Sequence, residues 1–92
     1  MFIETVEFEF INVRCINTIK EETDTTIISN VEYDQTCFVA HLDTGKKVVL
    51  HRVLTPKKHD YPYHKHNMEL TGYSTLLSEA LKKHNLIINI LS

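Results

Sequence analysis

The fold is decided by residues 36–54, TCFVAHLDTGKKVVLHRVL. Two runs rich in apolar and β-branched residues, 37–42 and 47–54, flank the turn signal DTGK at 43–46. The glycine of this turn can take the positive φ that a tight hairpin or its bulge requires. The two runs are therefore predicted to pair as an antiparallel hairpin. Pro56 is expected to end the second strand, because proline cannot donate to a ladder.

Upstream of this hairpin, the sequence predicts two further strands. Residues 5–10 alternate strictly, which is typical of a half-buried strand. Extended character continues through residues 13–19, with a bulge or a change of sheet face near residue 10. The polar run EETD at 21–24 predicts a turn, and residues 25–33 predict the next strand. The alternation assigns Val6, Phe8 and Phe10 to one face and Thr5, Glu7 and Glu9 to the other.

Downstream, the spacing of apolar residues changes to that of a helix. One continuous face predicts a helix over residues 73–85, with Ser74 as its N-cap and Asn85 as its stop. The run LIINIL at 86–91 is short and β-branched, and it predicts a final strand. The helical face consists of Tyr73, Leu76, Leu77, Ala80, Leu81 and His84.

The order of elements defines the fold class. Strands followed by a helix indicate an α+β domain over residues 1–92, with an antiparallel sheet of about five strands and one helix packed on a face, in the order β-β-β-β-α-β. We expect the helical residues Leu76, Leu77, Ala80 and Leu81 to be buried against Val6, Phe8 and Phe10 or the strands beside them. Cys15 and Cys37 occur singly in apolar runs of a chain without an export signal, so both are expected to be small buried thiols, with a disulfide between strands as the alternative. The absence of a CxxC motif argues against a zinc ribbon or a thioredoxin-like site.

Charge is divided along the chain, although the net charge is only −2. Residues 1–36 carry eight acids against two bases, and residues 45–68 carry six bases against one acid. Two interpretations stay open for the acidic half: lysines of neighbouring strands neutralise it, or a carboxylate-rich face imitates the phosphates of DNA. The candidate acidic surface consists of Glu4, Glu7, Glu9, Glu21, Glu22, Asp24, Glu32 and Asp34.

The basic half centres on residues 55–67, TPKKHDYPYHKHN. Tyrosine anchors protein interfaces, so a protein contact is the leading interpretation of this segment. Lysines that meet phosphates and tyrosines that stack on bases make nucleic-acid binding the second. A proline-bracketed loop whose tyrosines fold back on the sheet is the structural alternative. The candidate binding residues are Lys57, Lys58, His59, Tyr61, Tyr63, His64, Lys65 and His66.

The histidines of this half suggest metal chemistry as a further alternative. His64-x-His66 on an extended segment points both imidazoles the same way, and His59, His51 or Asp60 could complete a site. The neighbouring lysines would repel a divalent ion, so we expect no metal and no cofactor.

A nuclease is the enzymatic alternative. The run VLHR at 49–52, the pattern His64-x-His66-Asn67 and the downstream His84 resemble the ββα-metal fold of HNH nucleases. The resemblance implies a metal-dependent nuclease with a general-base histidine at a strand end and a further histidine on the helix. The chain has no Asp-His or His-His dyad and lacks the glycine-rich turn of that family.

Other features narrow the functional class. Two glycines cannot form a phosphate-binding loop, and no serine has a nucleophile context. The N-terminus has no signal peptide and no apolar run spans a bilayer, so a cytoplasmic location is expected. We therefore predict a small non-catalytic binding protein that docks on a host protein or nucleoprotein complex. Small phage inhibitors of host defence have this size and charge.

Overall fold

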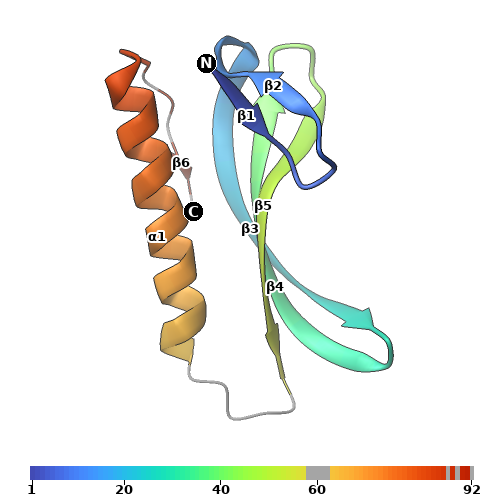
Figure 1. The fold of residues 1–92 in the computed structure, drawn as a ribbon. Helices are drawn as coiled ribbons and strands as arrows, with labels where there is room; N and C mark the ends of the chain where they lie inside the picture. Colours follow the sequence, from blue (N-terminus) through green and yellow to red (C-terminus); the bar gives the residue numbers. More distant parts are fainter. Residues whose placement is uncertain (58–62, 87, 89, 92) are drawn as a thin grey trace.

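The computed structural model describes residues 1–57, 63–86, 88, 90 and 91. Its elements form two sheets, a β1–β2 ribbon and a larger sheet of order β5-β4-β3-β6, together with one helix (Figure 1). The predicted α+β class is confirmed, with three long antiparallel strands in the larger sheet in place of the five expected. The elements are β1 (Phe2–Glu4), β2 (Phe10–Asn12), the 3-10 helix η1 (Val13–Cys15), β3 (Ile16–Ile28), β4 (Val31–Leu42), β5 (Lys47–Pro56), α1 (Tyr63–Lys83) and β6 (Ile90–Leu91).

Within the described part of the chain, no helix is both long and apolar enough to cross a bilayer. Both cysteines are free, as expected; Cys37 is buried and Cys15 is half-buried.

The β4–β5 hairpin has the predicted pairing. Cys37 lies opposite Arg52 and His41 opposite Lys47, and β5 ends at Pro56. Gly45 in the connecting turn has a φ of 86°, the left-handed conformation that glycine adopts without a steric penalty. The turn signal in the sequence therefore identified the connection and the antiparallel pairing.

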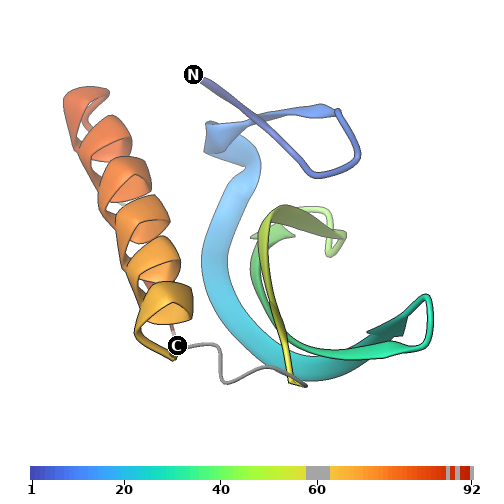
Figure 2. The same ribbon diagram turned by 60° about the horizontal axis from the view of Figure 1, so that its bottom comes forward.

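The β3–β4 connection differs from the prediction. Residues 21–24 lie inside β3, and the turn is formed by Ser29 and Asn30, with φ of 50° and 64°. Two consecutive residues with positive φ match the twist of a two-residue hairpin, in which Ile28 pairs with Val31. The acids at 21–24 are tolerated in a strand because the ribbon is largely exposed there. Figure 2 shows how strongly the long β3 and β4 strands curve.

The helix begins ten residues earlier than predicted. It runs from Tyr63 to Lys83, so Ser74 lies in its interior and is not an N-cap. Its end agrees with the expected stop, because Asn85 has a φ of 55° and its amide donates to the carbonyl of Lys82 at 3.0 Å. The amide of Leu86 donates to the carbonyl of Leu81 at 2.9 Å, which completes a Schellman motif.

The final strand is short and lies at an edge. Ile90 and Leu91 pair in parallel with Ile19 and Lys20 of β3. α1 therefore carries the chain across the sheet, from β5 at one edge to β6 at the other, and Figure 1 shows β6 between α1 and β3.

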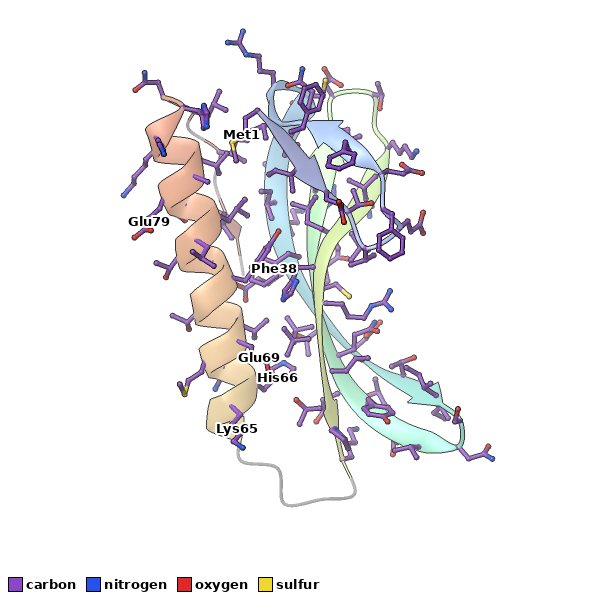
Figure 3. All side chains as sticks on the ribbon, viewed as in Figure 1. Met1, Phe38, Lys65, His66, Glu69 and Glu79 are labelled. Atoms are coloured by element: carbon purple, nitrogen blue, oxygen red, sulfur yellow. The ribbon has the colours of Figure 1, made fainter. Side chains whose placement is uncertain are left out.

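The core forms between α1 and the sheet. Leu77 and Leu81 are buried there as predicted, whereas Leu76 is 69 % exposed and Ala80 is half-buried. Phe38 on the central strand is fully buried and lies between helix and sheet in Figure 3. The buried cluster consists of Val13, Ile16, Ile19, Phe38, Ala40, Val48, Leu50, Leu77 and Leu81.

The prediction for residues 5–10 is wrong. Residues 5–9 connect β1 to β2, and only Phe10 belongs to a strand. Ile3 pairs with Ile11, and both pack against the core cluster. Because successive residues of a strand point to opposite faces, Phe10 faces outward. The expected core positions Phe8 and Phe10 are therefore on the surface.

Candidate functional site

The segment 55–67 is divided between two elements. Lys58, His59 and Tyr61 lie outside the described residues, together with Asp60. The first part of the segment completes β5, and the helix begins at Tyr63. Tyr63 and His64 lie on the first turn of α1. Lys65 is an exposed residue of the same turn.

His66 is a buried connection between the helix and the sheet. It is only 7 % exposed and lies on the side of α1 that faces the strands (Figure 3). Its Nδ1 is 2.6 Å from Thr55 Oγ1 and its Nε2 is 2.9 Å from Thr36 Oγ1. Thr36 Oγ1 is in turn 3.2 Å from Thr23 Oγ1. These hydrogen bonds therefore connect α1 through His66 to β5 and β4, and through Thr36 to β3.

The paired-histidine metal hypothesis required an extended segment. The segment is instead helical from Tyr63 onward, so the extended geometry that this hypothesis needs is absent. Among the described residues, no group of three or more His, Cys, Asp or Glu side chains is placed to hold a metal ion.

The histidines that suggested an HNH nuclease lie in separate places. His51 on β5 stacks on Tyr73 at a centroid distance of 4.3 Å and an angle of 10°. His84 follows the last turn of α1, eighteen residues after His66, which corresponds to about 27 Å along a helix. His66 and His84 cannot reach one metal ion across that distance.

Tyr73 lies against the rings of His51 and Phe38. This burial raises the pKa of the Tyr73 hydroxyl above its ordinary 10.0.

Lys57 neutralises part of the acidic half. Its Nζ lies 3.7 Å from Glu32 Oε1 and 3.5 Å from Asp34 Oδ1, and it donates to Thr25 Oγ1 at 3.2 Å. The sequence allowed neighbouring lysines to pair with the acids of these strands, and the structure confirms this for Glu32 and Asp34. The same contacts occupy a lysine that the nucleic-acid hypothesis assigned to phosphates.

The remaining acids are spread over both faces. Glu7 and Glu9 line one pocket of about 120 Å³ together with Lys46 and Lys47. Asp24 accepts a hydrogen bond from Gln35 at 3.0 Å. Glu21 and Glu22, as neighbours in β3, point to opposite faces, and Glu4 lies in β1.

The sequence analysis missed a surface of three phenylalanines. Phe2, Phe8 and Phe10, here called the phenylalanine surface, are 64 %, 81 % and 67 % exposed. In the β1–β2 ribbon, Phe10 lies opposite Glu4 and Phe2 opposite Asn12, so Phe2 and Phe10 are diagonal neighbours on the outer face. The available signal was compositional, because three of the four phenylalanines occur within residues 2–10.

The loop that presents Phe8 is tightly held. Buried Thr5 donates its amide to the carbonyl of Glu9 at 2.8 Å, and its carbonyl accepts from the amide of Phe8 at 3.0 Å. Its hydroxyl accepts from the amides of Glu7 and Glu9, each at 3.3 Å. The amide of Val6 donates to the carbonyl of Val49 at 3.0 Å, which fixes the loop to the edge of β5.

Phe8 itself has a φ of 63°. A left-handed conformation is unfavourable for a bulky L-residue, and such strain persists only where the surroundings impose it. The contacts of Thr5 and Val6 impose it here, and the result is a fixed backbone that presents an exposed aromatic side chain. Strained residues of this kind occur preferentially at binding and catalytic sites.

Among the residues that the structure describes, the other exposed apolar side chains do not form a comparable group. Ile27 and Ile28 are adjacent in β3 and point to opposite faces, and Met68 and Leu76 lie singly on α1. Isolated apolar side chains are normal on protein surfaces.

A scan against protein families and searches of curated proteins and of solved structures give no match to this chain.

Proposed function

We propose that this chain is a small non-catalytic binding protein that docks on a larger protein through the phenylalanine surface. The observation that carries the proposal is the exposure of Phe2, Phe8 and Phe10 on one short ribbon. Aromatic residues are enriched in protein interfaces and dominate their energetics. We further propose that the partner is a host protein or nucleoprotein complex, and that docking inhibits or assists it.

The three phenylalanines offer a large apolar contribution to docking. Full burial of one phenylalanine side chain contributes roughly 1.5–3 kcal/mol. Three such side chains therefore supply several kcal/mol on docking. The hydrogen bonds of Thr5 hold the backbone at Phe8 in place before binding, so little backbone entropy is lost when its ring is buried.

The acids of the same ribbon define the partner's chemistry. Glu4 lies opposite Phe10, and Glu7 and Glu9 flank Phe8 in the sequence. An apolar pocket with basic residues at its rim complements this arrangement. The same carboxylates oppose insertion into an anionic membrane surface or contact with nucleic-acid phosphates.

Site-specific photo-crosslinking tests the proposal. A benzoylphenylalanine at position 8 is compared with one at position 76, because Leu76 is similarly exposed but lies on the helix. In nuclease-treated extract of the native host, we expect a protein adduct from position 8 and none from position 76. Excess wild type should compete with the adduct, and excess Phe8→Ser should not. Equal adducts from both positions, or no protein adduct from position 8, would contradict the proposal.

Phe8→Gly separates binding from folding. A left-handed L-residue costs about 1–2 kcal/mol, whereas glycine loses roughly 0.5–1 kcal/mol through backbone entropy. We expect the free energy of unfolding in urea to stay equal or rise by up to about 1 kcal/mol, while the position-8 contact is lost. A clear loss of stability would show that the ring of Phe8 belongs to the core and not to a binding surface.

A further inference from the structure

The outer edge of β3 is only partly covered. β6 pairs with Ile19 and Lys20 alone. Among the described residues, no strand pairs with the outer side of β3 from Glu21 to Ile28. An open strand edge presents backbone donors and acceptors that can pair with another chain.

A groove lies between this edge and the helix. Glu21 of β3 forms one wall of a pocket of about 280 Å³, and the other wall comes from α1. Small-molecule sites usually enclose roughly 300–1,000 Å³, so this pocket fits a single side chain better than a compact ligand. The residues from α1 are Asn67, Leu70, Thr71, Ser74 and Thr75.

We propose that this groove binds an extended basic peptide of a partner protein, which pairs with the β3 edge as an added strand. The chain's own β6 uses the same edge, between α1 and β3, and runs parallel to β3 toward the open part (Figure 1). A peptide beside Glu21 and the following residues continues an interface that the fold already forms. Backbone pairing of this kind provides affinity, and alternate side chains provide specificity.

The charges of the edge select a basic peptide. Glu21 pairs with Phe38 across the ladder, so its carboxylate is on the face that packs against α1. Glu22 and Asp24 are on the opposite face. A lysine or arginine that points into the groove meets Glu21, and Glu22 and Asp24 add negative charge along the same edge.

The same charges disfavour a second copy of this chain. If two β3 edges paired with each other, Glu21, Glu22 and Asp24 of both copies would come together, and like charges in adjacent strands are destabilising. The groove is also separate from the phenylalanine surface. The loop that carries Phe8 attaches to β5, at the opposite edge of the sheet.

Binding of the fluorescein-labelled peptide TVKVTVKV tests the inference, with TVEVTVEV as the matched control. By fluorescence anisotropy, we expect the lysine peptide to bind the full chain and the glutamate peptide not to bind. Hydrogen exchange should slow at the amides of residues 21–28. Failure of the lysine peptide to bind, equal binding of both peptides, or protection confined to the β1–β2 ribbon overturns the inference.

Substitutions locate the peptide on the protein. Glu21→Lys should weaken binding by about tenfold or more, since it replaces an attraction of at least 1.4 kcal/mol with a repulsion. Glu4→Lys makes the same charge change on the other ribbon and should leave the affinity unchanged. Thr71→Trp fills the groove from an exposed position of α1, so it should weaken binding even if Glu21→Lys perturbs the sheet. Protection of residues 21–28 in concentrated protein without peptide would instead indicate self-association.

Discussion

The two halves of the helix–sheet interface use opposite chemistry on the same strands. Toward its C-terminal end, α1 packs Leu77 and Leu81 on apolar residues around Phe38. Toward its N-terminal end, it places His66 on Thr36 and Thr55. Apolar contact is non-directional and supplies most of the stability, whereas hydrogen bonds specify a geometry. One half therefore holds the helix on the sheet, and the other fixes where along the sheet it lies.

The change from apolar contacts to side-chain hydrogen bonds occurs between two successive inward-facing residues of β4. Phe38 and Thr36 are two residues apart on β4 and face the same side. Across the sheet, their partners in β3 are Glu21 and Thr23. Buried Val53 still lies opposite Thr36, and the polar contacts continue through Thr55 to the ion pairs of Lys57.

The largest expected effect comes from the apolar half. Leu77→Ala should lower the free energy of unfolding by about 2–5 kcal/mol, because it leaves a cavity in the core. Leu76→Ala is the matched control on the exposed side of the same turn and should change it by less than about 0.5 kcal/mol. Urea denaturation measures both. Similar small losses for the two variants would mean that the helix does not close the core.

Substitutions in the polar half should lower the free energy of unfolding less than Leu77→Ala does. His66→Leu removes both hydrogen bonds to the threonines and should cost about 1–3 kcal/mol. Thr55→Val, added to His66→Leu, removes the hydroxyl that the first substitution leaves without a partner. The loss in free energy of unfolding of the double variant should therefore be smaller than the sum of the losses of the two single variants. His84→Leu, at the exposed end of α1, is the control. Strict additivity would show that the Thr55–His66 bond contributes nothing.

The ion pairs at the end of this half should contribute least at neutral pH. Lys57→Met should cost about 1 kcal/mol or less, because all three charged groups contact solvent. The difference from wild type should shrink in 1 M NaCl, where the Debye length is only about 3 Å. Lys20→Met, at an exposed position of β3, controls for the loss of one charge. A loss that persists in high salt would point to packing of the lysine stem.

Tyr73, between the two halves, adds a pH dependence with no expected effect at pH 7. Its folded-state pKa is raised by burial above the ordinary 10.0, so the unfolded chain loses this proton first as the pH rises. The stability contribution is complete below about pH 10 and is lost as the pH rises toward the folded-state pKa. Relative to Tyr73→Phe, the wild type should therefore lose urea resistance only in that alkaline range. A difference that grows toward acidic pH would exclude this explanation.

Sequence patterns predicted the elements that depend on local signals. The DTGK turn gave the β4–β5 hairpin, and the leucine spacing gave the C-terminal half of α1. The helix start was missed because His66 occupies a core position: residues 66, 70, 73, 77 and 81 form one helical face, but a histidine does not count as apolar. Its threonine partners come from other strands, and sequence spacing does not show them.

The N-terminal prediction failed for a different reason. Residues 5–10 alternate as a half-buried strand does, yet the fold turns the chain at Thr5 and packs the half-buried Ile3 and Ile11 against the core instead. Alternation identifies two faces but does not show which one meets a core. The phenylalanine surface exists because the other face of this segment packs against the core. The groove at Glu21 exists because the helix begins before residue 67 and so lies beside β3. Neither could be read from local pattern alone.

The parallel pairing of β6 with β3 determines the order in which the chain can fold. Ile19 and Ile90 are 71 positions apart, whereas the turn between Ile28 and Val31 contains two residues. At about 0.6 kcal/mol per doubling of loop length, closing the longer span costs roughly 3 kcal/mol more entropy. Two paired residues cannot offset that by themselves, so we expect β6 to join the sheet only after α1 has packed. On this argument the β3–β4–β5 meander forms before β6 docks, and β6 is expected to open more readily than the long strands.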